Sequence, residues 1–322
     1  MNAIGVDVGG TKIAAAVVSP EGGILNEVRY PTQAVPPNRL VATIAQAISE
    51  VKDRYAVGGV CLAVPGLILA SENKVIFAPN LHEIENIPLD EEIGGRTGMS
   101  VTVENDANAA AWGEFRFGSG KDIEHLVFIT LGTGVGGGVI THGVLLRGAQ
   151  GAGGELGHVT VDSTGPRCGC GNHGCLEAFA SGTAIQRFAR EVANDRPGSA
   201  LGRLAIERQV LGEDVTRLAQ EGDEASVYVL HEAGRWLGIG LAGFVNTFNP
   251  EVIAVGGGAS RAGEFVLGPA RKEVQLRARS PSRDLVEIKG ATLGPESGVL
   301  GAAALARSED GEYILGPSKR VA

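Results

Sequence analysis

The amino-acid sequence predicts an α/β protein built from two related halves. In its first part, short apolar runs of strand length alternate with stretches whose apolar residues repeat at helical spacing. An arrangement of strand, glycine-threonine turn and strand occurs twice, once at the start of the chain and once near residue 130. The chain of 322 residues is long enough for two domains with cores of their own. We therefore expect two α/β domains, each opening with a similar hairpin.

The expected elements can be placed in chain order. We expect strands at residues 3–8, 12–18, 23–30, 58–63, 101–104 and 252–255, and a second hairpin over residues 126–141. Helices are expected at residues 38–55, 107–115, 183–194, 224–246 and 297–306. In the first of these helices, Leu40, Ile44, Ala47 and Val51 share one face, which predicts that this face packs against the sheet.

The first hairpin has the composition of a phosphate site. Asp7 ends the first strand, and Gly9 and Gly10 occupy the turn, where we expect backbone N–H groups left free for a ligand. Thr11 and Lys12 follow, and both side chains suit a phosphate. Asp7 could position a hydrated Mg²⁺ on that phosphate. Taken alone, the segment could equally be an ordinary hairpin with a Gly-Gly turn.

The second hairpin favours the ligand-binding interpretation, because two similar hairpins could hold one polyphosphate between them. Its glycines and threonine lie at Gly132, Thr133 and Gly134. Residues 132–137 also fit the dinucleotide fingerprint G-x-G-x-x-G, but that fingerprint opens a helix, whereas here the glycines continue into a strand. The P-loop pattern is absent as well, since Phe115 stands where its leading glycine should be.

Three of the four cysteines fall within eight residues, in the pattern C-x-C-x4-C at Cys168, Cys170 and Cys175. With His158 upstream they predict a tetrahedral zinc site of Cys3His type. Four protein ligands leave no open position, so we expect the zinc to be structural and to order the loop from His158 to Glu177. A disulfide with one thiol left over is the alternative. His173 could compete as the fourth ligand, although its spacing from the cysteines is tight.

The motifs together resemble the ROK family (repressors, open reading frames and kinases), within the actin-like and hexokinase-like ATPases. The matching segments are Asp7-x-Gly9-Gly10-Thr11-Lys12, Glu104-Asn105-Asp106-Ala107-Asn108-Ala109, residues 131–138, Gly154-Glu155-Leu156-Gly157-His158, the cysteine loop ending in Glu177, and Val255-Gly256-Gly257-Gly258. The resemblance implies duplicated ribonuclease H-like domains with a structural zinc loop. It also implies a small domain over residues 1–106, completed by residues of about 297–322, and a large domain over residues 107–296.

The resemblance further implies the use of ATP with Mg²⁺ to phosphorylate a hexose or hexosamine hydroxyl. By match to the family motifs, Asp106 is the general base, although in isolation it could be the N-cap of the helix that follows. The residues implied to bind the sugar are Gly66, Asn80, Asn105, Asp106, Glu155, His158 and Glu177. Those implied to bind the nucleotide and Mg²⁺ are Asp7, Gly9, Gly10, Thr11, Lys12, Gly132, Thr133, Gly134, Gly256, Gly257 and Gly258.

The expected substrate is glucose, phosphorylated at its 6-hydroxyl, because glucose is common in this family. N-acetylmannosamine or N-acetylglucosamine is the alternative, and fructose, or polyphosphate as donor, is a weaker variant. The stretch after Asn80 lacks a tryptophan expected of many family glucokinases, so the motifs do not fix the sugar. A sugar-sensing regulator of the family is the third interpretation. Such regulators carry an N-terminal helix-turn-helix domain, whereas here the first hairpin begins at Ala3.

Composition restricts the possible partners. The net charge of −9 disfavours nucleic acid and anionic membranes. No apolar run approaches the length needed to span a bilayer, and no cleavable leader precedes the first strand, so we expect a cytoplasmic protein. The 49 glycines agree with several ligand loops of bare backbone. By resemblance, we expect a homodimer or a homotetramer.

Overall fold

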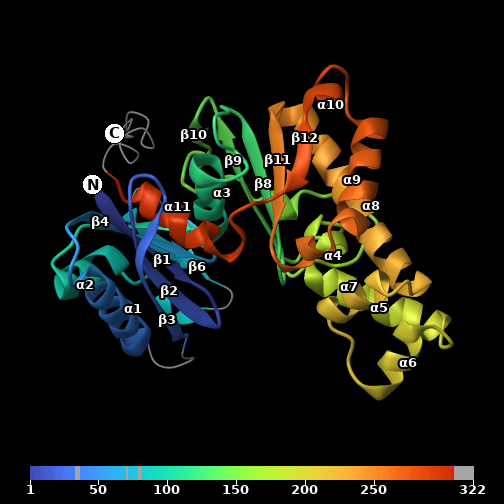
Figure 1. Cartoon of the computed structure of the whole chain (residues 1–322), viewed down its shortest axis with the longest axis horizontal. Coiled ribbons are helices and arrows are strands. Elements are labelled where there is room, and N and C mark those ends of the chain that lie inside the picture. The colour runs from blue at the N-terminus through green and yellow to red at the C-terminus, as the bar shows by residue number, and fades with distance from the viewer. Residues whose placement is uncertain (33–36, 70–71, 79–80, 308–322) are drawn as a thin grey trace. The chain divides into compact units, whose positions relative to one another are not determined.

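The computed structural model describes residues 1–32, 37–69, 72–78 and 81–307, and it divides the chain into two compact units (Figure 1). The first unit comprises residues 1–124, 138–154 and 293–322, and the second comprises residues 125–137 and 155–292. This division places residues 107–124 and 138–154 with the N-terminal sheet, whereas the sequence led us to place them in the large domain. Among the described residues, no helix is long and apolar enough to cross a membrane.

The first unit is organised around a five-stranded sheet with the strand order β3-β2-β1-β4-β7. Its strands are β1 (Asn2–Val8), β2 (Lys12–Val18), β3 (Ile24–Pro31), β4 (Val57–Val64) and β7 (Val101–Asn105). The first three run antiparallel, and β4 and β7 run parallel to β1. The central strands are apolar on both faces because helices cover both sides. Asp7 and Asn105 therefore both lie at the carboxyl ends of parallel strands.

Helices α1 (Pro37–Lys52) and α2 (Leu89–Thr97) contribute to the core on one face of this sheet. The other face is covered by α11 (Ser297–Leu305), which also packs on α3 (Asp106–Phe117). These contacts are backbone to backbone: a Cβ added at Gly5 would lie 1.9 Å from the carbonyl oxygen of Val299, and one at Gly301 would lie 1.7 Å from that of Ala109. The short strands β5 (Leu67–Leu69) and β6 (Lys74–Phe77) and the 3-10 turn His82–Ile84 complete the unit's N-terminal part.

A second sheet has the strand order β10-β9-β8-β11-β12. Its strands are β8 (Leu126–Leu131), β9 (Val135–Thr141), β10 (Val144–Leu145), β11 (Val252–Gly256) and β12 (Glu287–Gly290). If the strands of each sheet are numbered from one to five along the chain, both sheets have the same spatial order, 3-2-1-4-5. In each sheet the glycine-threonine turn joins the first two strands. The internal repeat predicted from the two hairpins is therefore confirmed at the level of topology.

The second unit is mostly helical outside its strands. Its helices are α4 (Glu177–Ala180), α5 (Gly182–Asp195), α6 (Ala200–Glu207), α7 (Gly212–Gln220), α8 (Glu224–Phe248), α9 (Glu264–Arg277) and α10 (Ser282–Leu285). Its 3-10 turns are Leu156–His158 and Gly258–Ala262, and a third such turn, Gly294–Glu296, belongs to the first unit. The long helix α8 begins at its N-cap Asp223 and packs closely on α9, because Gly234 and Gly238 admit the α9 backbone.

Candidate active site

Asp106 lies where β7 passes into α3. The N-cap of this helix is Asn105, whose Oδ1 accepts hydrogen bonds from the amides of Ala107 at 2.9 Å and Asn108 at 3.0 Å. The capping role that the sequence left open for Asp106 therefore belongs to its neighbour. Asn105 Nδ2 also donates to the carbonyl oxygen of Gly66 at 3.0 Å, which joins two of the expected sugar-binding residues. Asn80 lies outside the described residues.

Asp7 and Asp106 form a pair of interacting carboxylates in the first unit. Burial, followed by the negative charge of Asp106, raises the pKa of Asp7 to about 6, and Lys12 partly offsets this. Burial also raises the pKa of Asp106, against the hydrogen bond from the Ala107 amide. A carboxylate with a raised pKa is a better proton acceptor near neutral pH. Two such groups close together also favour a bound cation, which fits the Mg²⁺ expected beside Asp7.

The first glycine-threonine turn is closed by its own backbone. The amide of Gly9 donates to the carbonyl oxygen of Lys12 at 2.9 Å, so this amide is not free for a phosphate as the sequence led us to expect. Thr32 supports the turn through its hydroxyl, 2.5 Å from the carbonyl oxygen of Gly9. Gly10, Thr11 and Lys12 are exposed and remain available to a ligand.

The second glycine-threonine turn is supported by the segment that follows the cysteine loop. Glu177 Oε2 accepts from the amide of Val135 at 3.0 Å, and the Thr183 hydroxyl donates to the carbonyl oxygen of Thr133 at 2.8 Å. The amide of Gly182 donates to the carbonyl oxygen of Gly132 at 2.8 Å. This turn is therefore fixed by three residues that lie close together at the start of α4 and α5.

The three cysteines and His158 converge as the sequence predicts. All four candidate ligand atoms lie within 4.8 Å of one another. Cys170 Sγ is 3.7 Å from Cys175 Sγ, and Cys168 Sγ is 3.6 Å from His158 Nδ1. Zn–S bonds of about 2.3 Å in a tetrahedral site place two sulfur ligands about 3.8 Å apart, so these residues fit a zinc ion. His173 is not in this cluster, and its Nδ1 lies 3.3 Å from the carbonyl oxygen of Gly165.

The expected sugar residues of the second unit surround the cysteine cluster. Glu155 directly precedes the 3-10 turn that carries His158, and its Oε2 lies 4.0 Å from His158 Nε2. The imidazole thus directs Nδ1 at the cysteines and Nε2 at Glu155. Glu177 is equally close to the cluster, since its Oε1 lies 3.3 Å from Cys168 Sγ. A metal in the cluster would therefore fix all three residues.

A cavity of about 580 Å³ opens in the second unit beside the second turn. Three of the residues predicted to bind the nucleotide line it, namely Gly132, Thr133 and Gly258. Of the predicted glycine triplet, Gly257 has a φ of 86°, and a Cβ there would lie 2.5 Å from the backbone of Leu131, so only glycine fits. Gly256 ends β11 and leads the chain to this wall of the cavity.

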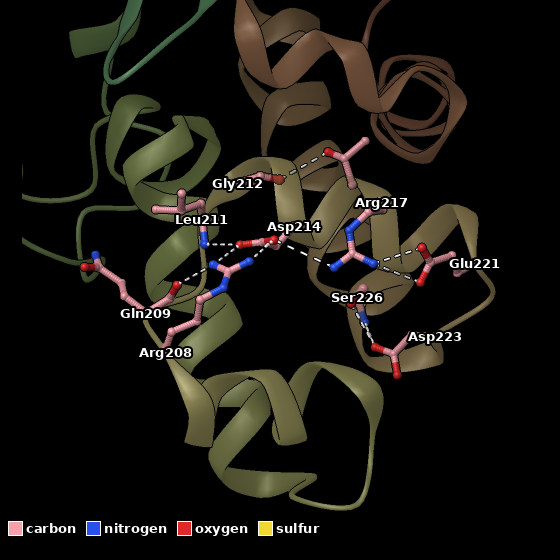
Figure 2. Close-up of polar contacts among 10 residues, drawn as sticks. Arg208, Gln209, Leu211, Gly212, Asp214, Arg217, Glu221, Asp223 and Ser226 are labelled. Atoms are coloured by element: carbon pink, nitrogen blue, oxygen red, sulfur yellow. Dashed lines mark hydrogen bonds and ion pairs between the residues drawn. The ribbon is translucent and has the colours of Figure 1, made fainter.

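Helix α7, which was not predicted from the sequence, contributes a large part of the remaining lining. The remaining lining residues are Gly182, Thr183, Ile185, Gln186, Leu211, Gly212, Glu213, Thr216, Arg217, Gln220, Ala259 and Arg261. Figure 2 shows that Arg208 and Arg217 both point at Asp214. Arg208 binds it through two hydrogen bonds of 2.6 and 2.8 Å, and Arg217 also binds Glu221. This network fixes α7 and holds Arg217 at the rim of the cavity.

Comparison with known proteins agrees with these features. Residues 3–309 match the ROK family. The chain belongs to the ROK family. A glucokinase of Streptomyces coelicolor is 40% identical over 95% of this chain and 98% of its own length. A ROK glucokinase of Streptomyces griseus, solved in complex with glucose and AMPPNP, matches with a TM-score of 0.83 and 40% identity, over 95% of this chain and 99% of that one.

Other ROK relatives differ in what they do. An N-acetylmannosamine kinase of Escherichia coli is 33% identical over 96% of this chain and 99% of its own length. A xylose repressor of Bacillus subtilis is 32% identical over 94% of this chain and 76% of its own length. Membership of the ROK family thus fixes the fold of the chain, and the choice among these functions depends on the site.

Proposed function

We propose that this protein is an ATP-dependent sugar kinase that phosphorylates glucose at its 6-hydroxyl. The observation that carries the proposal is the Asp106 carboxylate at the start of α3, with its raised pKa and with Asp7 beside it. The proposal is also supported by the 40% identity to glucokinases over nearly the whole chain. A regulator that only senses sugar has no need of a carboxylate placed to accept a proton.

In the proposed reaction, Asp106 accepts the proton of the sugar hydroxyl as the hydroxyl oxygen attacks the γ-phosphorus of ATP. The bond between the γ-phosphorus and the oxygen bridging to the β-phosphate breaks, and ADP leaves. Phosphoryl transfer requires mainly positioning and charge stabilisation, and a general base contributes about 10²- to 10⁴-fold. Asp7 would hold Mg²⁺ through its water ligands, and the bound cation would stabilise charge on the transferred phosphoryl group. Lys12 and Thr11, both exposed, would bind phosphate oxygens.

The remaining residues would bind the two substrates. Asn105 already donates one amide hydrogen to Gly66 and has one left for a sugar hydroxyl. Glu155, His158 and Glu177 would bind further hydroxyls, held in place by zinc in the Cys3His cluster. The cavity beside Thr133 and Gly258 would accept the adenosine part of the nucleotide.

The test is ADP release from Mg-ATP by the purified protein with glucose, mannose, fructose, N-acetylglucosamine and N-acetylmannosamine in separate reactions. We expect turnover on glucose with the highest kcat/KM, abolished in Asp106→Asn. Preference for an N-acetyl sugar would retain the mechanism and replace the substrate, in line with the N-acetylmannosamine kinase relative. Absence of turnover on every sugar, with glucose binding intact by calorimetry, would favour a sensor.

A further inference from the structure

A buried ion pair lies directly beneath the junction that carries Asp106. Glu104, in β7, accepts a hydrogen bond on its Oε2 from Arg147 Nε at 2.6 Å, and Arg147 Nη2 lies 2.5 Å from the same oxygen. The two side chains are only 7% and 11% exposed. Arg147 follows β10, so the pair joins two segments of the first unit that are far apart in sequence.

The other carboxylate oxygen of Glu104 holds the junction itself. Glu104 Oε1 accepts from the backbone amide of Asn105 at 3.0 Å and from Asn108 Nδ2 at 3.0 Å. The first donor is the backbone amide of the residue before Asp106, and the second is a side chain in the first turn of α3, so Glu104 holds groups on both sides of Asp106. Because Asp106 Oδ1 accepts from the next amide, Ala107, the direction of its carboxylate follows the backbone of this turn.

Stability alone does not account for the pair. Two charges removed from water lose much of their mutual attraction to the cost of desolvation. Arg147 Nη1 and Asn108 Oδ1 are also buried without a hydrogen-bond partner among the described residues, which adds to that cost. An apolar pair of similar volume would serve a purely structural purpose better. The ion pair instead holds the strand-to-helix junction in one orientation, because Arg147 fixes the Glu104 carboxylate and this carboxylate accepts hydrogen bonds from the junction.

We propose that Glu104 and Arg147 are positioning residues that hold the Asp106 carboxylate in the geometry needed for proton transfer. The proposal rests on the function proposed above, in which Asp106 is the general base. Misplacement of a reacting group by about 1 Å can reduce a rate by about 10²-fold. Loss of the pair therefore lowers kcat, while the affinity for the nucleotide, whose proposed cavity lies in the second unit, stays nearly unchanged.

The test is a double-mutant cycle between the pair and the base. Glu104→Gln, Arg147→Met and the double variant Glu104→Gln/Arg147→Met are each made in the wild-type and Asp106→Asn backgrounds. In the wild-type background we expect kcat to fall about 10- to 100-fold with KM for ATP within about twofold. In the Asp106→Asn background we expect no further loss, because residues that act through Asp106 cannot matter once it is replaced.

Thermal unfolding separates this proposal from a structural role. Either single variant leaves one buried polar partner uncompensated and lowers Tm, whereas the double variant removes both charges and recovers Tm. We expect kcat to stay low in that stable double variant. Asp223→Ala, which removes the N-cap of α8 in the other unit, serves as control: it lowers Tm and leaves kcat unchanged. Arg147→Lys keeps the charge and should restore part of kcat.

A kcat that recovers together with Tm in the double variant would show that the pair only stabilises the fold, and the proposal would be wrong. Wild-type kcat in Glu104→Gln beside an inactive Asp106→Asn would overturn the positioning role alone. Full activity of Asp106→Asn would overturn the assignment of the base, and the positioning role with it.

Discussion

The two glycine-threonine turns occupy the same place in sheets of the same topology, yet they are supported by different chemistry. The turn at residues 9–12 closes on its own backbone and follows Asp7, whose pKa is raised by burial and by Asp106. The turn at residues 132–134 has hydrogen bonds from Glu177, Gly182 and Thr183, beside the Cys3His cluster. The two copies of the hairpin have therefore diverged. The first lies beside two interacting carboxylates, and the second is held by a loop that a metal could order.

We expect substitution of Asp106, the carboxylate that interacts with Asp7 at the first turn, to have the strongest effect on activity. Asp106→Asn keeps the hydrogen bond to Ala107 and removes only the proton acceptor, so we expect kcat to fall about 10²- to 10⁴-fold. Binding of Mg-AMPPNP by calorimetry should change little, because the cavity proposed for its adenosine part lies in the second unit and Asp106 is not among the residues proposed to bind its phosphates. Loss of nucleotide affinity in this variant would show that Asp106 contributes to nucleotide binding and does not act only as the base.

Removal of zinc should affect the other turn. Cys170→Ser or chelation releases the loop that holds His158 and Glu177, and we expect KM for glucose to rise about 10- to 100-fold. Amide hydrogen exchange should accelerate at residues 132–135 and stay unchanged at residues 9–12. His173→Ala is the matched control, since it removes a histidine from the same loop and should leave one zinc bound per chain by atomic absorption. Equally faster amide hydrogen exchange at both turns would contradict the expectation that the cysteine loop supports only the second turn.

The pH dependence of stability tests the charge at the first turn. The pKa of Asp7 is about 6 in the folded protein, above its ordinary value of 3.8, so the folded state binds this proton more tightly than the unfolded state does. Its contribution to stability is therefore fully present below pH 4 and is lost as the pH rises through 6. We expect Asp7→Asn to increase the free energy of unfolding at pH 7.5 by at most about 3 kcal/mol, and not at pH 4.

Denaturant unfolding at the two pH values measures this difference. An equal increase in the free energy of unfolding at pH 4 would mean that the negative charge of Asp7 does not destabilise the folded protein. Addition of Mg²⁺ with the nucleotide should reduce the gain at pH 7.5, because a bound cation compensates the charge that Asp7 carries in the wild-type protein.

The smallest expected effect concerns one hydroxyl at the second turn. Thr183→Val removes the hydrogen bond to the carbonyl oxygen of Thr133 and keeps the side-chain volume. A single hydrogen bond of this kind contributes about 1 kcal/mol, so we expect KM for ATP to rise about fivefold with kcat unchanged. Thr247→Val, which removes a similar hydrogen bond within α8, should leave both constants as they are. A rise in KM for glucose alone would place Thr183 with the sugar residues instead.

Much of the fold could be predicted because its strands are continuous apolar runs. The five strands of the first sheet, the second hairpin and α8 lie within a few residues of their predicted positions. Helix α1 ends at Lys52, three residues before the predicted end, because Tyr55 leaves the helix and its hydroxyl donates to the carbonyl oxygen of Leu25. The strands β5, β6, β10 and β12 and the helices α2, α4, α6, α7, α9 and α10 were missed. All of them except α9 have fewer than ten residues, and α9 contains Pro269, a residue that usually ends a helix.

The candidate site could be predicted where it depends on sequence motifs and not where it depends on tertiary contacts. The Cys3His cluster converges as predicted because its members lie within one loop. Asn105 was expected to bind sugar, but nothing in the sequence showed that its side chain caps α3 and bonds Gly66. Arg147 is separated from Glu104 by a complete hairpin, so no local pattern could show that they pair.

The close packing of α11 on β1 has a consequence for how the protein is made. A Cβ at Gly5 would overlap the backbone of Val299, so one face of the first sheet is covered by α11, the last helix that the structure describes. During synthesis the strands that bear Asp7 and Asn105 leave the ribosome early, but their sheet keeps one apolar face open until α11 follows. The first unit is therefore complete only after α11 has been synthesised, and a truncation before Ser297 should yield aggregation-prone protein and not a working half.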